Sequence, residues 1–408
     1  MNPQWKAGNR VELLENGEEL YPRVFGAIDG ARYEVLLETF ILFDDEVGRR
    51  LAEALKAASA RGVRVELTVD AWGSAELPTD YLEALTAAGV CLHLFEATHP
   101  KWLQRIDWFR RLHRKLVVVD GRCAFVGGIN FSQDHLEHGG HGKEAKQDYA
   151  VQVEGPLVAD IHRFAVEAIR SVHRRDGALP AIPAEALERG AEPAGDVVAT
   201  FVSRDNLPGR RTAIERYYRM IIRRAEERLV IANAYFFPGY RLLREIRRAA
   251  RRGVDVRLIT QAEPDIPISR FAGRLLYDYL LEAGAHIYEY GERQFHGKVA
   301  IVDDEWATVG SSNLDPLSLW FNLEANVVVR DAAFTEAVAR RLERLMHEHC
   351  REITPADTRR WIFWRPIAGF FAFHFLRHFP RLAGLLPAHR PRLTRVPAPG
   401  KDAGREAA

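Results

Sequence analysis

Apolar residues between positions 33 and 69 change their period twice, and the change predicts a strand, a helix and a second strand. YEVLLETF, beginning at Tyr33, is an extended apolar run, and VRVELTV, ending at Val69, alternates in the manner of a strand. The RGV at residues 61–63 marks the end of the helix between them. Apolar positions at the 3.6-residue period predict the buried face of that helix: Val47, Leu51, Ala54, Leu55 and Ala58.

The same pattern recurs from Leu229. LVIANAYFF predicts a strand, RGV at residues 252–254 ends a helix, and VDVRLIT predicts the next strand. The apolar face of this second helix consists of Leu242, Ile246, Ala249 and Ala250. A third helix follows in each half, ending in LTAAGVCLHLF and in LLEAGAHIYEY. The chain is therefore predicted to contain an internal duplication, and its alternating strands and helices predict α/β layers with mixed or mainly parallel sheets.

Shifts in composition divide the chain into four predicted segments. Residues 1–175 form the first half, residues 176–198 a linker or loose crossing rich in Pro, Gly and Ala, and residues 199–355 the second half. Residues 356–408 form a basic, aromatic carboxyl-terminal segment that contains WIFWRPIAGFFAFHFL. That run is too short to span a bilayer, and two interpretations stay open: a membrane-interface contact, or a helix packed on the lobes. The insertion PKWLQRIDWFRRL at residues 100–112 is similarly amphiphilic, and it predicts a second contact or a lid.

Composition narrows the class of protein. The 408 residues are 47% hydrophobic, enough to bury the cores of a globular protein of two or three domains or a duplicated one. The net charge of +1 argues against a general polyanion binder, so any basic function is local. Three cysteines that form no CxxC pair argue against a disulfide framework or a zinc knuckle and favour a reducing compartment. The amino terminus lacks the apolar core of a signal peptide.

The candidate chemistry lies in a motif that occurs once in each half. LHRKLVVVDG begins at Leu112 and FHGKVAIVDD at Phe295, and each contains His, Lys and Asp at the same spacing. A Gly and an Asn follow at equal offsets, in FVGGIN and in TVGSSN. The first copy comprises His113, Lys115, Asp120, Gly127 and Asn130, and the second comprises His296, Lys298, Asp303, Gly310 and Asn313. Each half alone supplies one imidazole, one ammonium and one amide, so we expect the two halves to combine into one site.

Two lysines and two asparagines make a donor-rich cage for an anion, while two histidines serve as nucleophile and as proton donor. This set suits in-line cleavage of a phosphodiester. Metal hydrolysis is the weaker alternative, because a protonated lysine has no lone pair and neither half contains an HExxH or clustered-carboxylate pattern. We therefore expect no metal and no other cofactor. His135, His138 and His141 in HLEHGGHGK are interpreted as a polar loop beside the site.

Two of the motif positions have a structural alternative. Asp120 and Asp303 stand at predicted strand ends, where aspartate commonly forms turns, although the motif also makes them candidates for catalysis. Gly127 and Gly310 are either ordinary strand-end glycines or positions at which the backbone approaches a phosphate.

The two motifs resemble the HKD signature of the phospholipase D superfamily, and the resemblance covers about residues 10–355. TVGSSNLDPLSLWFNLEANVVV, after His296, is similar in particular to the short form of bacterial cardiolipin synthases. The resemblance implies two related α/β lobes with mixed sheets flanked by helices, one active site at their interface, a phosphohistidine intermediate and no metal. It also implies His113 as nucleophile and His296 as general acid and then base. Phosphate binding is carried over to Lys115, Lys298, Asn130 and Asn313, with Gly127, Gly310 and Ser311 beside them.

An acid is expected to orient each imidazole through its other nitrogen. Asp148, in QDYAVQV, lies 35 residues after His113, and Glu324, in NLEANVVV, lies 28 residues after His296. Both stand on predicted strands after a motif, and both are therefore candidates for this role.

The resemblance implies that the protein transfers a phosphatidyl group between two phosphatidylglycerol molecules, which gives cardiolipin and glycerol. The alternatives are a phospholipase D hydrolase, a transferase that uses phosphatidylethanolamine as donor, and, less favoured, a nuclease. The expected partners are an anionic phospholipid membrane and phosphatidylglycerol, without nucleic acid. The expected location is the cytoplasmic side of a bacterial cell membrane, as a peripheral protein.

Overall fold

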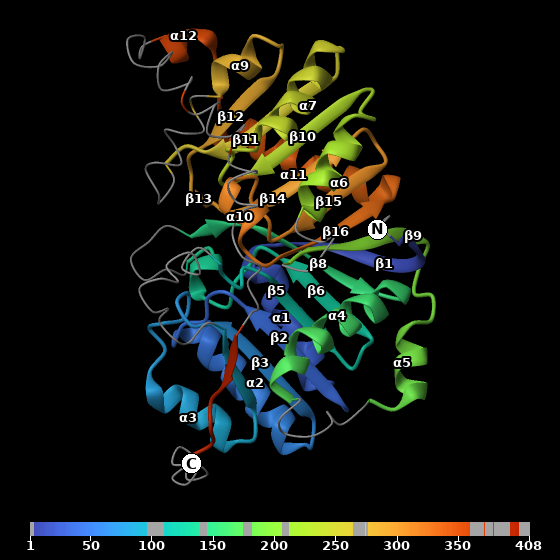
Figure 1. Ribbon diagram of the computed structural model, residues 1–408, viewed down its shortest axis with the longest axis vertical. Helices are drawn as coiled ribbons and strands as arrows, with labels where there is room; N and C mark the ends of the chain where they lie inside the picture. Colours follow the sequence, from blue (N-terminus) through green and yellow to red (C-terminus); the bar gives the residue numbers. More distant parts are fainter. Residues whose placement is uncertain are drawn as a thin grey trace.

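The computed structural model describes residues 4–95, 110–138, 145–173, 182–205, 212–263, 274, 276–359, 371, 378 and 392–399. The amino-terminal half comprises β1 (Lys6–Glu15), α1 (Asn16–Asp29), β2 (Glu34–Thr39), α2 (Glu46–Ala60), β3 (Arg64–Asp70), α3 (Thr79–Ala87), β4 (Cys91–Phe95), β5 (Lys115–Val119), β6 (Cys123–Gly127), the 3-10 helix η2 (Gln133–His135), β7 (Lys146–Gln147), β8 (Tyr149–Glu154) and α4 (Pro156–His173). Figure 1 shows this half as the lower lobe.

The second half follows α5 (Ala184–Gly190). It comprises β9 (Val197–Arg204), α6 (Ala213–Ile222), β10 (Arg228–Asn233), α7 (Tyr240–Arg251), β11 (Asp255–Gln261), α9 (Tyr277–Leu281), β12 (His286–Tyr290), β13 (Gln294–Phe295), β14 (Lys298–Val302), β15 (Trp306–Gly310), α10 (Pro316–Trp320), β16 (Glu324–Arg330), α11 (Ala332–His349), β17 (Cys350–Ile353), α12 (Pro355–Arg359) and β18 (Leu393–Arg395).

The strand order confirms the predicted duplication. One sheet runs β17-β12-β11-β10-β14-β15-β16-β9-β1-β8-β6-β5-β2-β3-β4-β18, so the two halves mirror one another about the β9–β1 pair. β2, β3 and β4 are parallel, as are β10, β11 and β12, whereas β5 and β14 run antiparallel to β2 and β10. The sheet is therefore mixed, and the two lobes share it across their junction (Figure 1).

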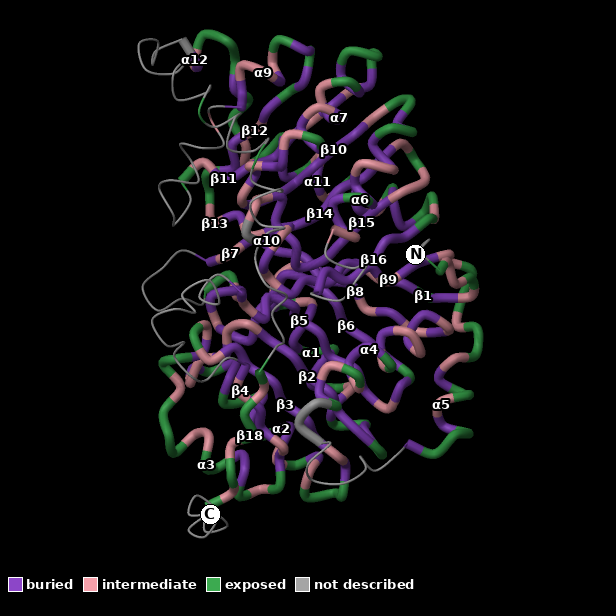
Figure 2. The backbone as a smooth tube through the Cα atoms, viewed as in Figure 1, coloured by how far each residue is buried: buried purple, intermediate pink, exposed green. Residues whose placement is uncertain are grey.

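Helices cover both faces of this sheet, and the side chains of β5 point alternately to the two faces. Leu116 and Val118 belong to the core cluster that contains residues of α4 and α11, whereas Val117 and Val119 belong to the cluster of α1 and α2. The central strands are accordingly buried along most of their length (Figure 2). Because side chains two apart leave the same face of a strand, Lys115 lies on the face covered by α1 and α2.

The predicted helix faces are confirmed. Val47, Leu51, Leu55 and Ala58 of α2 are buried, and so are Leu242, Ile246, Ala249 and Ala250 of α7. The Asp45 carboxylate accepts a hydrogen bond from Gly48 N and caps the start of α2.

Two segments contain structure that the composition does not predict. The predicted linker includes α5, and a Cβ atom at its Gly190 would lie 2.3 Å from Gly121 O, so α5 packs against the β5–β6 turn. Within the carboxyl-terminal segment, β18 pairs antiparallel with β4 of the first lobe. Most of that segment, and residues 100–109 of the insertion, lie outside the described residues. Among the described residues, no helix is long and apolar enough to cross a membrane.

Candidate active site

The two motif histidines meet at the junction of the lobes. His113 stands two residues before β5 and His296 two residues before β14, and their ring centroids are 6.4 Å apart. The backbone of the opposite half holds each one: His113 N donates to Leu323 O at 3.0 Å, and His296 N donates to Gln147 O at 2.8 Å. The structure thus brings the two motifs together in a single site.

Each imidazole is oriented by a carboxylate from the other half of the chain. His113 Nδ1 lies 3.1 Å from the Glu324 carboxylate, and His296 Nδ1 lies 2.5 Å from Asp148 Oδ2. Both acids are fully buried. Each acid follows the motif of its own half in the sequence but contacts the histidine of the other half. The sequence positions of the two acids therefore suggest the opposite pairing. Because each Nδ1 is occupied by a carboxylate, each Nε2 remains for a substrate.

The two acids have different supports. Ser311 Oγ donates to Glu324 Oε2 and in turn accepts from Ala325 N at 3.0 Å, so its hydroxyl is committed to the acid. Gly128 occupies the equivalent position in the first half, and a Cβ atom there would lie 2.4 Å from Asp148 Oδ1. The missing side chain therefore makes room for the Asp148 carboxylate. Ser311, which the resemblance places among phosphate-binding residues, instead holds Glu324.

Gly127 and Gly310 are explained by strand packing. A Cβ atom on Gly127 would lie 2.4 Å from the Ala150 Cβ, and one on Gly310 would lie 2.4 Å from the Asn326 Cγ. Each glycine therefore lets β6 or β15 pair closely with the neighbouring strand, β8 or β16. Strand packing explains both glycines as ordinary strand-end residues, and it requires no contact with a phosphate.

Two buried lysines supply the positive charge. Lys115 Nζ donates to His113 O at 2.8 Å, and Lys298 Nζ donates to His296 O and lies 3.7 Å from Asp148 Oδ2. Burial lowers the pKa of Lys115 to about 7 and that of Lys298 to about 8. The two ammonium groups therefore change charge close to neutral pH.

Burial also sets the charge of the imidazoles. It lowers the pKa of His113 and, helped by the positive charge of Lys298, lowers the pKa of His296 still further. Burial raises the pKa of Asp148, whereas at Glu324 the effect of burial is outweighed by contacts with His113, Lys115 and Ser311, and its pKa is lowered. Both histidines are thus neutral at pH 7, and His113 faces an ionised partner.

Asn130 and Asn313 are buried beside the motif strands, with exposed fractions of 2% and 5%. Asn130 Oδ1 accepts a hydrogen bond from Ile41 N at 3.1 Å, which leaves the amide NH2 group as the donor for another partner. No hydrogen-bond partner is found for Asn313 Oδ1 among the described residues.

Asp120 and Asp303 lie away from the histidines. The Asp120 carboxylate accepts from the backbone N–H groups of residues 32–34, and Asp303 accepts from those of residues 226–228. Both adopt left-handed backbone conformations, with φ of 51° and 50°. Five residues of extended strand place Asp120 about 16 Å from Lys115. Their contacts are those of turn residues, so including them among catalytic residues is not supported by their position.

Sequence reasoning missed two residues of the site. The Phe40 ring lies 5.1 Å from the His113 ring, and Lys115 Nζ stands 5.3 Å from its centroid. His135 is buried, and its ring lies 5.9 Å from that of His296. The histidine spacing in HLEHGGH is the signal that points to His135, although the pattern predicts a polar loop. Phe40 follows an apolar strand and had no distinguishing signal.

His135, Asp148 and His296 are also the described group whose ligand atoms lie close enough to hold a metal ion, all within 4.8 Å of one another. Asp148 Oδ2 is already bound to His296 Nδ1 and lies 3.7 Å from the Lys298 ammonium group. A cation there would compete with both contacts, so the donor set fits hydrogen bonding better than metal binding.

Paired imidazoles, each with a buried carboxylate, together with two lysines are the groups that suit the transfer of a phosphate-containing group. A family model described as cardiolipin synthase, PLD-like domain, matches residues 24–163 and 218–346. Cardiolipin synthase B of Salmonella typhi is 48% identical over 401 residues, with 97% of this chain and 95% of that protein covered. Cardiolipin synthase B of Escherichia coli (strain K12) is 46% identical over 407 residues, covering 98% of this chain and 96% of that protein.

Among solved structures, a phosphatidylserine synthase from Haemophilus influenzae Rd KW20 is similar in fold. The TM-score is 0.66 at 14% identity, and the match covers 91% of this chain and 96% of that one. The chain belongs to the cardiolipin synthase family of phospholipase D-like enzymes.

Proposed function

We propose that this enzyme joins two phosphatidylglycerol molecules into cardiolipin and releases glycerol, through a phosphatidyl group bound to histidine. The observation that carries the proposal is the pair of crossed histidine–carboxylate contacts that face one another across the lobe junction, His113–Glu324 and His296–Asp148. One imidazole on each side of a phosphorus atom is the arrangement that in-line displacement needs.

In the first step His113 Nε2 attacks phosphorus, the bond from phosphorus to the glycerol oxygen breaks, and protonated His296 gives its Nε2 proton to that oxygen. The anionic phosphodiester offsets the effect of burial and raises the pKa of His296, which favours the proton it has to deliver. In the second step neutral His296 takes the proton of an acceptor hydroxyl as the oxygen attacks phosphorus. The phosphorus–nitrogen bond then breaks, and cardiolipin leaves.

The assignment of His113 as nucleophile rests on the different carboxylate contacts. Glu324 is held by Ser311 and ionised, so it keeps the proton of His113 on Nδ1 and the lone pair on Nε2. Asp148 Oδ2 accepts from His296 Nδ1 at 2.5 Å, so its carboxylate can stabilise the imidazolium that forms whenever His296 holds the transferred proton. Lys115, Lys298 and the two asparagine amides would stabilise the charge that develops on the non-bridging oxygens.

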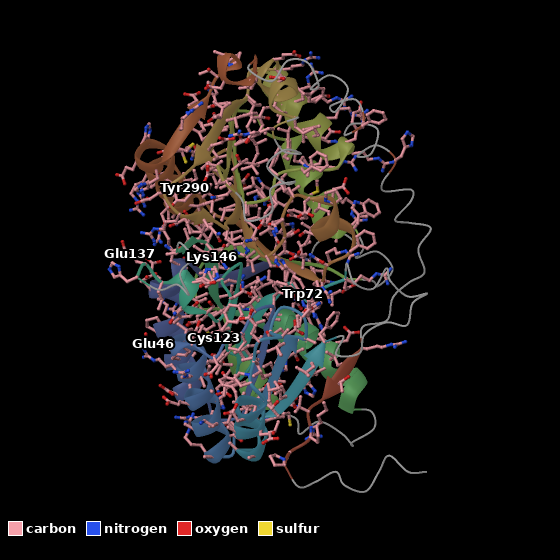
Figure 3. The ribbon with its side chains drawn as sticks, turned by 90° about the vertical axis from the view of Figure 1, so that its left-hand side faces the viewer. Glu46, Trp72, Cys123, Glu137, Lys146 and Tyr290 are labelled. Carbon is pink, nitrogen blue, oxygen red and sulfur yellow. The ribbon has the colours of Figure 1, made fainter. Side chains whose placement is uncertain are left out.

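We further propose that the enzyme acts as a peripheral protein on an anionic phospholipid membrane, at the cytoplasmic face of a bacterial cell. Trp72 is 66% exposed, and the Arg111 guanidinium lies 5.1 Å from its ring centroid. Trp72 stacks on Phe40, which contacts His113, so this exposed aromatic and cationic pair leads to the site. Figure 3 labels Trp72 close to the junction of the two lobes. Tryptophan and arginine favour the headgroup region of anionic membranes. The three free cysteines favour the cytoplasmic side.

The test is to incubate purified protein with phosphatidylglycerol vesicles and to identify the products by mass. Cardiolipin and free glycerol should dominate over phosphatidic acid, and added glycerol should reverse the reaction. Dominant phosphatidic acid would make the enzyme a hydrolase, and phosphatidylglycerol formed from phosphatidylethanolamine and glycerol would favour the other donor. Cleavage of DNA without action on lipid would contradict the proposal.

The proposed membrane contact has its own test. Replacing Trp72 with Ala should weaken vesicle sedimentation, whereas Tyr33→Ala serves as the exposed aromatic control.

A further inference from the structure

His135 is a third imidazole in the active site, and the mechanism above does not use it. It ends the short helix η2, five residues after Asn130, and only 1% of its surface is exposed. One of its ring nitrogens lies within 4.8 Å of ligand atoms of both Asp148 and His296. His138, in the same loop, is exposed. His135 thus lies beside the site, as expected, but its side chain is buried whereas that of His138 is exposed.

The hydrogen bonds of His135 determine which nitrogen carries its proton. Asn130 N donates to His135 Nε2 at 3.3 Å, so Nε2 presents its lone pair. Burial lowers the pKa of His135 well below the usual value, and the positive charge of Lys146 lowers it further, so the ring is neutral. In a neutral ring whose Nε2 accepts, the proton stands on Nδ1.

The Nδ1–H group has no hydrogen-bond partner among the described residues, although it is buried. A buried donor without a partner is costly, and native proteins keep such groups where a ligand or a catalytic role uses them. Here the unused donor belongs to a ring beside His296 and Asp148. Because the ring is neutral, it adds a donor without adding a third positive charge beside Lys115 and Lys298.

The second half contains no equivalent imidazole. The residue five positions after Asn313 is Ser318, which lies in the short helix α10 and whose N–H donates to Asp315 Oδ1. The two halves thus differ in two linked ways: the first has Gly128 where the second has Ser311, and the first alone places a histidine beside the carboxylate of the general acid. The duplicated site is therefore asymmetric around the phosphate.

We propose that His135 binds the substrate directly: its Nδ1–H donates to a non-bridging oxygen of the phosphodiester on the side of His296. The inference deepens the proposed function, because the ligand is the phosphodiester of the same site. It requires a tetrahedral oxyanion at that site, and it is independent of which lipid or alcohol the enzyme uses.

Two substitutions separate this role from a purely structural one. His135→Asn keeps a donor near the position of Nδ1 and loses the acceptor for Asn130 N, whereas His135→Gln keeps an acceptor near the position of Nε2 and loses the donor. The measurements are the affinity for tungstate, a tetrahedral oxyanion, turnover of a water-soluble short-chain phosphodiester, and thermal unfolding. His138→Gln, exposed in the same loop, is the matched control.

We expect His135→Gln to unfold near the wild-type temperature and to bind tungstate about 10- to 100-fold more weakly, the loss typical of a hydrogen bond to a charged group. His135→Asn should unfold at a lower temperature, because Asn130 N loses its acceptor, and should bind tungstate within about threefold of wild type. Wild-type affinity in His135→Gln, or equal losses of affinity in both variants, would overturn the proposal. If neither variant folds, the 15N resonance of His135 Nδ1–H in the wild-type enzyme decides: tungstate should shift it, and an unchanged resonance would overturn the proposal.

Failure of this inference is distinguishable from failure of the proposed function. The lipid products report on donor and acceptor, whereas tungstate affinity reports on the oxyanion site alone. An enzyme that makes cardiolipin with wild-type tungstate affinity in His135→Gln would refute only the role of His135. A hydrolase with the expected loss of affinity would refute only the proposed acceptor.

Discussion

Anion binding should weaken steeply as pH rises from 7 to 9, because the two site lysines lose their charge in that range. Burial lowers the pKa of Lys115 to about 7 and that of Lys298 to about 8 in the free enzyme. A bound oxyanion favours the charged form of each lysine and raises its pKa. By linkage, affinity is then greatest below pH 7 and falls as pH rises through the pKa values of the free enzyme.

The size of the effect follows from the charged fractions. At pH 7 about half of Lys115 and about nine-tenths of Lys298 carry a proton, and at pH 9 these fractions fall to about one in a hundred and about one in ten. If the complex needs both ammonium groups, affinity should fall about 500-fold between the two pH values, and about 50-fold if it needs Lys115 alone. Burial lowers the pKa of both histidines, so they are neutral at pH 7 in the free enzyme. The figures above count the lysines alone, and uptake of a proton by His296 on anion binding makes the fall steeper.

The assay is calorimetric titration with tungstate, whose charge does not change between pH 7 and pH 9. In Lys298→Met the fall in affinity between pH 7 and pH 9 should be about tenfold smaller than in the wild type, the factor that belongs to Lys298. His138→Gln, which alters an exposed residue, should titrate like the wild type. Affinity that stays flat from pH 7 to pH 9 in the wild type would refute the assignment of the lysines as charged phosphate donors.

Three further predictions concern individual groups. Asp303→Ala should lower the free energy of unfolding by about 2–4 kcal/mol, because several backbone N–H groups lose their acceptor, and the kcat of the folded fraction should not change. The control Asp304→Ala, at an exposed neighbour, should change stability little. A loss of kcat at wild-type stability would contradict the turn role of Asp303. Ser311→Ala should lower kcat about tenfold with little change in KM, because Glu324 loses a hydrogen-bond donor. The control Ser312→Ala should leave kcat unchanged, because the Ser312 hydroxyl donates to Asn313 O and not to Glu324. An unchanged kcat in Ser311→Ala would show that the hydrogen bond from Ser311 is dispensable. Chelation with EDTA should leave turnover intact, since lysines and histidines supply the charge and the proton transfer; activity lost in EDTA and restored by zinc would contradict the metal-free mechanism.

Much of the architecture was predictable because the chain repeats its own pattern. Two copies of strand, helix, RGV and strand indicated a duplicated α/β fold, and two motifs at equal spacing indicated one composite site. Such regularities are local, since period and turn chemistry act over a few residues. The mirrored strand order then follows from two similar halves that share one sheet.

The remaining features depend on contacts between the halves. Asp148 and Glu324 were recognisable as buried strand acids, but their exchange of partners arises only when the lobes join, where His113 N meets Leu323 O and His296 N meets Gln147 O. His135 lies in a polar, glycine-rich stretch, and no local pattern tells whether such a loop folds inward. The pairing of β18 with β4 likewise joins segments that are distant in sequence, and a strand of only three residues has no pattern that predicts its partner.

The central claim, one covalent site built from both halves, is tested most directly by trapping the adduct. His296→Ala removes proton delivery and leaves the nucleophile, so a donor lipid with a good leaving group should still load the enzyme and stall. Peptide mapping by mass spectrometry should place the phosphatidyl group on His113, and His113→Ala should give no adduct. An adduct on His296 in the His113→Ala variant would exchange the two roles, and the absence of any phosphohistidine in either variant or in the wild type during turnover would contradict the account.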